Sequence, residues 1–280
     1  MNMIKFRLFT LFCLVTFIWS CENTDSAAKE SKSDNMAQFV DEEQFKDAHE
    51  EPSTIEVQSS GHMIDFDTPD GQKGNAFTIL PSSETKSYLF VIHEWWGLND
   101  NIKQEAQKYA DSLENVAIIA LDIYDGKVAD NPEDAGKLMQ AVKEDRAKAI
   151  IEGALSYVGD DAKVATIGWC FGGGWSLKSS ITAGSKAAGC VMYYGMPVQE
   201  KETIAVLQAD ILGIFAEKDG WITPEVVSNF EKMAKDAGKV ITIHQYDAEH
   251  AFANPSSPRY HKEAAQDANA KALAFLRAKL

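Results

Sequence analysis

The stretch VATIGWCFGGGWS, residues 164–176, contains a cysteine inside a glycine-rich turn. A buried cysteine with a packing role needs no special backbone around it. Here Gly168 precedes Cys170 and three glycines, 172–174, follow it, which indicates a chain bent too sharply for neighbouring side chains. A helix-like segment starts at this point, so the thiol would lie near unpaired backbone N–H groups, which favour a thiolate and later an oxyanion. The pattern predicts a nucleophile, with the Phe171 amide as one oxyanion donor.

An acid and a histidine follow the cysteine along the chain, each after a strand-like run. Asp219 ends the run ADILGIFAEKD, and His250 follows VITIHQYD through DAEH. A histidine can accept and return a proton near neutral pH, and a carboxylate fixes its tautomer and orientation. The order nucleophile, acid, histidine is that of α/β-hydrolases, whose nucleophile lies in a G-x-S-x-G turn; here Cys170 takes the serine position. Singly, Asp219 could be a helix N-cap and His250 a core histidine, but together the three predict a catalytic triad.

Glu94 lies in IHEWWG, at the end of another strand-like run. A carboxylate buried there should have a raised pKa and could act as a base towards a thiol. The alternative is a partner for a neighbouring helix N-terminus. His93 precedes Glu94 and would point to the opposite face of the strand, so we expect a structural role for His93.

The six histidines show no His-x-x-x-His spacing, and the chain has no CxxC pair, so the sequence predicts no metal site. The stretch GWCFGGGWS also lacks the Lys-Ser/Thr ending of a phosphate loop. We therefore expect no cofactor.

Six continuous, β-rich apolar runs between residues 87 and 247 alternate with helix-like segments. Such runs are typical of strands buried on both faces, and HMIDFDTP and NAFTILP, around the turn DGQKGN, indicate an opening hairpin. The alternation predicts one α/β domain, residues 59–280, with a mostly parallel central sheet and helices on both faces. Sites in such sheets gather at the carboxyl ends of the strands, where the residues above lie. The helix-like segments are 101–113, 132–158, 173–183, 224–237 and 258–280.

Residues 1–20 have the layout of an export signal, because two basic residues precede an apolar run too short to span a membrane. The ending IWSC loosely resembles a lipobox, which predicts lipidation of Cys21 and an exported lipoprotein of the bacterial cell envelope. A simply secreted protein is the alternative. Residues 21–58 are acidic and Ser-rich, and they predict a disordered tether, whose acidity could instead recruit a basic partner.

The net charge of −15 over 280 residues argues against nucleic acid and against an anionic membrane surface as partners. We expect a small-molecule substrate, and contact with a membrane only through the lipid anchor. In an oxidising envelope Cys170 and Cys190 could form a disulfide, but Cys190 begins a strand-like run in which a small buried hydrophobe is common. The sequence leaves the oligomeric state open, with a monomer favoured.

Residues 88–277 resemble the dienelactone hydrolase family (carboxymethylenebutenolidases), which are α/β-hydrolases with a cysteine nucleophile. The resemblance depends on HEWWGLND at 93–100, GWCFGGG at 168–174, EKDGWI at 217–222 and HAFAN at 250–254. It implies a triad of Cys170, Asp219 and His250. It also implies that Glu94 holds the resting thiol and takes its proton, and that the amides of Trp95 and Phe171 form the oxyanion hole.

Two positions depart from the family pattern. Members of the family hold the substrate carboxylate with arginines, whereas this chain has Asn254 after the histidine motif and Lys127 near the second position. A lysine lacks the bidentate fork of arginine, so dienelactone itself is not the expected substrate. We place Trp96, Lys127, Trp221 and Asn254 in the substrate pocket.

The sequence therefore predicts a hydrolase of a small ester or lactone that works through an acyl-enzyme on Cys170. The alternative is a non-hydrolytic envelope protein in which Cys170 is redox-sensitive or lies in a ligand-binding pocket. A weaker alternative is an interaction module that binds a partner through the acidic tether.

Overall fold

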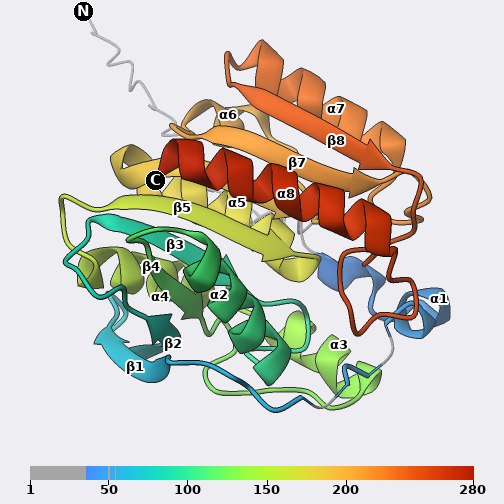
Figure 1. The fold of residues 1–280 in the computed structure, drawn as a ribbon. Helices are drawn as coiled ribbons and strands as arrows, with labels where there is room; N and C mark the ends of the chain where they lie inside the picture. Colours follow the sequence, from blue (N-terminus) through green and yellow to red (C-terminus); the bar gives the residue numbers. More distant parts are fainter. Residues whose placement is uncertain (1–35, 50, 54) are drawn as a thin grey trace, which may run out of the picture. The chain divides into compact units, whose positions relative to one another are not determined.

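The computed structural model describes residues 36–49, 51–53 and 55–280, so the predicted export signal and Cys21 lie outside the described residues. An eight-stranded sheet runs through the molecule in the order β1-β2-β4-β3-β5-β6-β7-β8 (Figure 1). The pairs β1–β2 and β2–β4 are antiparallel, and all the other neighbours are parallel. The strands are β1 (His62–Asp67), β2 (Lys73–Ile79), β3 (Ser87–Ile92), β4 (Ala117–Leu121), β5 (Lys163–Trp169), β6 (Ala187–Tyr193), β7 (Asp210–Ala216) and β8 (Ile241–Tyr246).

Helices cover both faces of this sheet, so the predicted α/β-hydrolase architecture is confirmed. Figure 1 shows α2 and α8 in front of the strands, with α4 and α5 packed together behind them. The helices are α2 (Asp100–Ser112), α3 (Pro132–Ala141), α4 (Glu144–Tyr157), α5 (Phe171–Ala183), α6 (Lys201–Ala205), α7 (Pro224–Asp236) and α8 (Lys262–Lys279), with a 3-10 turn, η2 (Gly184–Lys186), after α5. In the described residues, no helix combines the length and the hydropathy needed to cross a bilayer.

The helix expected over residues 132–158 is two helices. Asn131 caps α3, but Val142 and Lys143 have extended backbones, with ψ of 119° and 124°, and α4 begins after them. The break lets α3 pack against a 3-10 turn near the N-terminus, η1 (Met36–Phe39), while α4 packs against β1 and β2. Tertiary packing thus overrides a continuous helical pattern.

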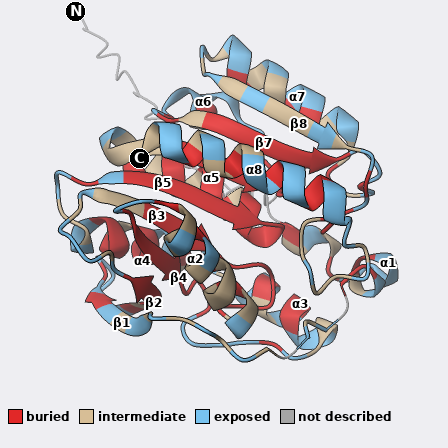
Figure 2. Ribbon diagram, in the orientation of Figure 1, coloured by how far each residue is buried: buried red, intermediate tan, exposed pale blue. Residues whose placement is uncertain are grey.

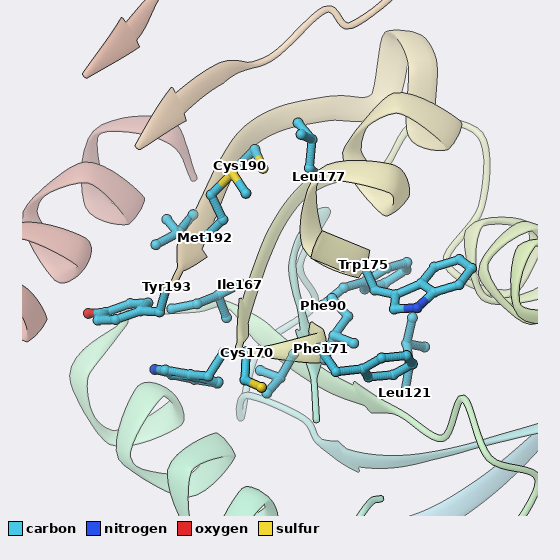
Figure 3. Close-up of a cluster of buried hydrophobic side chains, with 14 of the residues drawn as sticks. Phe90, Leu121, Ile167, Cys170, Phe171, Trp175, Leu177, Cys190, Met192 and Tyr193 are labelled. Carbon is cyan, nitrogen blue, oxygen red and sulfur yellow. The ribbon is translucent and has the colours of Figure 1, made fainter. Parts of the chain in front are cut away.

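The central strands are buried almost throughout, as parallel strands covered on both faces must be (Figure 2). Figure 3 shows side chains from β3, β4, β5 and α5 in one cluster beside Cys170, among them Phe90, Leu121, Ile167 and Trp175. Trp175 therefore lies in the core. This packing fixes the end of β5 and the start of α5, between which Cys170 lies.

The segment before the hairpin differs from the expected disordered tether. Residues 36–49 form η1 (Met36–Phe39) and α1 (Glu43–Asp47), so ordered structure occurs before residue 59, where the sequence places the start of the domain. The physical reason is a set of apolar residues among the acids, whose burial offsets the entropic cost of ordering the chain. The buried members of this set are Met36, Val40, Phe45 and Ala48.

Candidate active site

Cys170 lies at the turn between β5 and α5, with a left-handed φ of 53° and ψ of −120°. Such a backbone costs a non-glycine residue about 1–3 kcal/mol, so the surroundings must hold it. A Cβ on Gly168 would lie 2.1 Å from Gly172 O, and a Cβ on Gly172 would lie 2.4 Å from the carbonyl oxygens of Ile92 and His93. These positions must be glycine for the turn to form, and the turn presents Cys170 at the N-terminus of α5.

Asp219 and His250, which are 31 residues apart, meet beyond the ends of β7 and β8. His250 Nδ1 lies 2.6 Å from Asp219 Oδ2, and both residues are buried. The loops that carry them are held together, because Lys218 N donates to Ala248 O at 3.0 Å. The amides of Trp221 and Ile222 each donate to Asp219 Oδ1 at 2.9 Å.

The charge state of Asp219 fixes the tautomer of His250. Burial raises the pKa of the Asp219 carboxyl, but His250 and the two amides outweigh burial and hold the pKa below its ordinary value. The ionised carboxylate accepts from Nδ1–H, so in the neutral form of the ring Nε2 carries the lone pair. Nε2 is buried and has no hydrogen-bond partner among the described residues. The ring can therefore accept a proton at Nε2.

Cys170 is a neutral thiol in this structure. Burial, together with the nearby Glu94 carboxylate, raises the pKa of Cys170 well above its ordinary value, against the opposing effect of the Phe171 amide. Its Sγ lies 3.8 Å from His49 Nε2. Cys190 is also a free, buried thiol, with its Sγ 3.7 Å from Ser176 Oγ, so the structure contains no Cys170–Cys190 disulfide.

Glu94 lies just beyond β3 and is held by Asn254, whose Nδ2 donates to Glu94 Oε2 at 2.7 Å. Burial, with a contribution from Glu105, raises the pKa of Glu94 to about 7, and the hydrogen bond from Asn254 opposes this shift. A carboxyl group with a pKa of about 7 can both take up and release a proton near neutral pH.

His93 anchors the loop that carries Glu94 and Trp95. His93 Nδ1 donates to Glu94 O at 2.6 Å, and Ile123 N donates to His93 Nε2 at 3.2 Å. Burial lowers the pKa of His93 to about 4, so the ring is neutral. This is the structural role expected of His93. Through these two hydrogen bonds it fixes the backbone just before Trp95.

A cavity of about 240 Å³ lies beside Glu94 and Asn254. Lys127, which the sequence places in the substrate pocket, is exposed and lines a different cavity with Tyr124 and Arg146. Trp96 is buried against Trp95, and Trp221 packs near His250, with ring centroids 5.8 Å apart. Of the four predicted pocket residues, Asn254 lines the cavity that contains Glu94. Other lining residues are Ile102, Glu105, Lys108, Trp169 and Asn269.

Two residues near Cys170 have no counterpart in the sequence-based prediction. His49 follows α1 and is buried, and burial lowers its pKa to about 3. Tyr194 follows β6 with a left-handed φ of 34°, and its ring lies 5.1 Å from the ring of His250. The four-residue spacing of Phe45 and His49, which would place them on one face of a helix, is a signal that could have indicated His49.

A doubly covered parallel sheet and a strained cysteine turn at the carboxyl end of its central strand define the class as α/β-hydrolase. The dienelactone hydrolase family model matches residues 75–280, and the chain belongs to that family. It is a hydrolase of ester or lactone bonds, and membership does not favour the alternative of a non-hydrolytic envelope protein.

Two sequence relatives and one solved structure are similar to this chain. The chain is 31% identical over 206 residues to Protein usf of Aquifex pyrophilus, covering 69% of this chain and 87% of the relative. It is 33% identical over 134 residues to a carboxymethylenebutenolidase of a Pseudomonas species, covering 46% of this chain and 54% of that one. A solved dienelactone hydrolase-like promiscuous phosphotriesterase from metagenomic libraries has the same fold, with a TM-score of 0.66 and 20% identity, covering 79% of this chain and 99% of its own.

Proposed function

We propose that the protein hydrolyses a small ester or lactone through a triad of Cys170, His250 and Asp219 and a covalent acyl-enzyme. The observation that carries this proposal is the 2.6 Å contact between His250 Nδ1 and Asp219 Oδ2, with Nε2 of the same ring unpaired among the described residues. A protein that only binds a ligand has no need of a buried carboxylate behind the histidine.

The first step is removal of the thiol proton. Because burial disfavours the thiolate, the resting protein avoids an exposed, oxidisable sulfur anion. Glu94, with a pKa near 7, accepts the proton as substrate binds and passes it to His250 Nε2, which becomes an imidazolium beside the Asp219 carboxylate.

Acylation and hydrolysis then follow as two addition–elimination steps. The thiolate forms a bond to the carbonyl carbon, and the amides of Trp95 and Phe171 hold the resulting oxyanion. The intermediate collapses, the carbon–oxygen bond breaks, and the leaving alkoxide takes the proton from His250. A water molecule then gives a proton to His250 and attacks the thioester; release of the acid returns the thiolate, which takes that proton back.

We propose an uncharged acyl group, because the cavity beside Glu94 offers no free cation among the residues that line it. Lys108 is paired with Glu105 there, and Asn254 is engaged with Glu94. The remaining polar groups are amides and carboxylates, which can donate to or accept from a neutral ester but do not balance a substrate carboxylate.

The test is a burst-phase assay with p-nitrophenyl acetate, in which intact mass spectrometry detects the acyl-enzyme. We expect a burst of about one equivalent and an acetyl adduct in the parent protein, and neither in Cys170→Ala. His250→Gln should form the adduct slowly or not at all, because it removes the base while leaving the thiol. Turnover that survives in Cys170→Ala would overturn the proposal.

We also propose that the protein is exported and anchored to the bacterial cell envelope by lipid on Cys21. The support is the IWSC sequence and the basic and apolar residues before it. Metabolic labelling with radioactive palmitate should mark the parent protein and not Cys21→Ala. Labelling that persists in Cys21→Ala would contradict the anchor, and an unlabelled parent protein found free outside the cells would indicate simple secretion.

A further inference from the structure

The N-terminal segment brings a fourth side chain, His49, to the three residues of the predicted triad. Phe45 of α1 packs edge-on against Trp95 and Trp221, with ring centroids 5.3 Å and 5.1 Å away. Glu42 Oε2 accepts a hydrogen bond from Trp221 Nε1 at 2.9 Å. These contacts hold His49 over the nucleophile, and the hydrolytic steps proposed above make no use of it.

Both histidines beside Cys170 direct an unprotonated nitrogen towards the site. His49 Nδ1 donates to Phe45 O at 2.6 Å, just as His250 Nδ1 donates to Asp219. In a neutral imidazole the other nitrogen is then an acceptor, so each Nε2 carries a lone pair. The thiol of Cys170 has one hydrogen to share between the two rings, and His250 Nε2 remains unpaired within the described residues. Two Nε2 lone pairs and the Cys170 thiol are thus buried together, and this cluster has too few hydrogen-bond donors.

We propose that His49, Cys170 and His250 bind a divalent cation of the zinc class. Cys170 Sγ and one ring nitrogen from each histidine lie within 4.8 Å of one another. Tetrahedral zinc, with bonds of about 2.3 Å to sulfur and about 2.0–2.1 Å to nitrogen, separates sulfur from nitrogen by about 3.6 Å and the two nitrogens by about 3.3 Å. The observed distance of 3.8 Å between Cys170 Sγ and His49 Nε2 matches that requirement.

The surroundings of the two histidines also suit a metal site. A histidine that binds a metal commonly donates its second nitrogen to a carboxylate or a backbone carbonyl, and here Asp219 and Phe45 O take those places. One thiolate and the neighbouring Asp219 carboxylate balance a double positive charge in a buried site. Thiolate and imidazole ligands favour zinc over magnesium or calcium, which prefer oxygen.

Metal binding would have two consequences. The cation replaces the thiol hydrogen, which leaves as a proton, and it occupies His250 Nε2, so neither group can take part in hydrolysis. Because His49 belongs to residues 36–49, the metal also ties this segment across the nucleophile. This metal site goes beyond the proposed function. It requires only that the three ligand side chains are in place, and it does not require the protein to hydrolyse an ester.

The test is a titration of the tag-free, metal-free mature protein with Co²⁺, a spectroscopic substitute for Zn²⁺. We expect one cobalt per chain, a thiolate-to-cobalt charge-transfer band in the near ultraviolet, intense visible bands of a tetrahedral ion, and displacement of cobalt by Zn²⁺. His49→Gln should weaken binding at least tenfold by removing one ligand. His62→Gln, an equal change at an exposed histidine of β1, is the matched control and should bind as the parent does.

Two further variants keep the proposal open to refutation. Cys170→Ser should lose the charge-transfer band, and His49→Cys should restore tight binding and strengthen the band, because it supplies a second thiolate. Absence of the band in the parent, or equal affinity in the parent and His49→Gln, would overturn the three-ligand site. Cobalt binding with this pattern in a protein that forms no acyl-enzyme would refute the proposed function and leave the metal site intact, and the reverse result would do the opposite.

Discussion

His49 Nε2 lies 3.8 Å from Cys170 Sγ, and Cys170 is only 1% exposed beneath the segment that carries His49. The segment is held mainly by Phe45, which is fully buried between Trp95 and Trp221. We therefore expect that a substrate reaches the thiol only when residues 36–49 move aside, and that the Phe45 contacts set how often Cys170 is accessible.

Replacement of that anchor should expose the nucleophile. Truncating a buried Phe costs about 3–5 kcal/mol, which is large for a segment of this length. We expect Phe45→Ala to raise the rate of alkylation of Cys170 by iodoacetamide at least tenfold, measured by peptide mass spectrometry. Phe275→Ala, on the remote helix α8, is the matched control and should leave the rate unchanged. Equal alkylation of all three proteins would show that the segment does not limit access.

The pH dependence of catalysis should follow Glu94. Because the pKa of Glu94 is about 7 and the carboxylate is the form that accepts the thiol proton, kcat/KM should rise about tenfold per pH unit below pH 7 and level off above it. Glu94→Gln should abolish this rise with pH and reduce kcat/KM by about 10²–10⁴-fold. Asn254→Ala removes a hydrogen bond that favours the carboxylate, so in this variant the rise should shift to higher pH. An unshifted rise in Asn254→Ala, or a rise that remains in Glu94→Gln, would assign the ionisation to another group.

The same ionisation should appear in stability. A carboxyl group whose folded pKa lies above its unfolded value of 4.5 binds more protons when folded, so the free energy of unfolding falls as pH rises from about 4.5 through 7. The change is on the order of 3 kcal/mol, since one pKa unit corresponds to about 1.4 kcal/mol. Urea unfolding at several pH values should show a shallower decline for Glu94→Gln than for the parent. Identical slopes would contradict a buried, destabilised Glu94 carboxylate.

The turn around Cys170 could be predicted because its cause is local. Gly168 and Gly172 approach backbone carbonyls so closely that no other residue fits, and this need is visible in the sequence as GWCFGGG. The apolar runs similarly predicted the buried parallel strands. The contact between Asp219 and His250 could be predicted because the order of strand ends along the chain matches that of α/β-hydrolases.

The contacts of the N-terminal segment could not be predicted in the same way. A five-residue helix is unstable in isolation, so α1 exists because Phe45 finds Trp95 and Trp221, residues far away in the chain. The pairing of Asn254 with Glu94 and the placement of Lys127 in a separate cavity likewise depend on how loops meet in space. The acidic, Ser-rich composition of the segment indicated disorder, but the burial of four apolar side chains outweighs the cost of ordering it.

A methyl group on Gly172 should disrupt the turn. Its Cβ would lie 2.4 Å from the backbone oxygens of Ile92, the last residue of β3, and of His93, which follows it, and such backbone atoms have little room to shift. We expect Gly172→Ala to lower the free energy of unfolding by at least about 2 kcal/mol, and the melting temperature by several degrees. Gly220→Ala is the matched control, because its Cβ would meet no atom within 4 Å. Calorimetry showing equal melting temperatures for the two variants would contradict the tight packing of the turn.

Asp219→Asn tests whether the carboxylate acts by fixing the tautomer of His250. The asparagine oxygen can still accept from the amides of Trp221 and Ile222, but its Nδ2 then faces His250 Nδ1 as a donor. The proton of the ring then moves to Nε2, and Nε2 can no longer accept the thiol proton. We expect kcat to fall by about 10²–10⁴-fold with little change in melting temperature, and partial recovery in Asp219→Glu, which keeps the charge.

Stopped-flow measurement of the burst separates the acylation rate from hydrolysis of the acyl-enzyme. A rate within a fewfold of the parent in Asp219→Asn would show that His250 is oriented by other contacts, such as the rings of Tyr194 and Trp221 that pack against it.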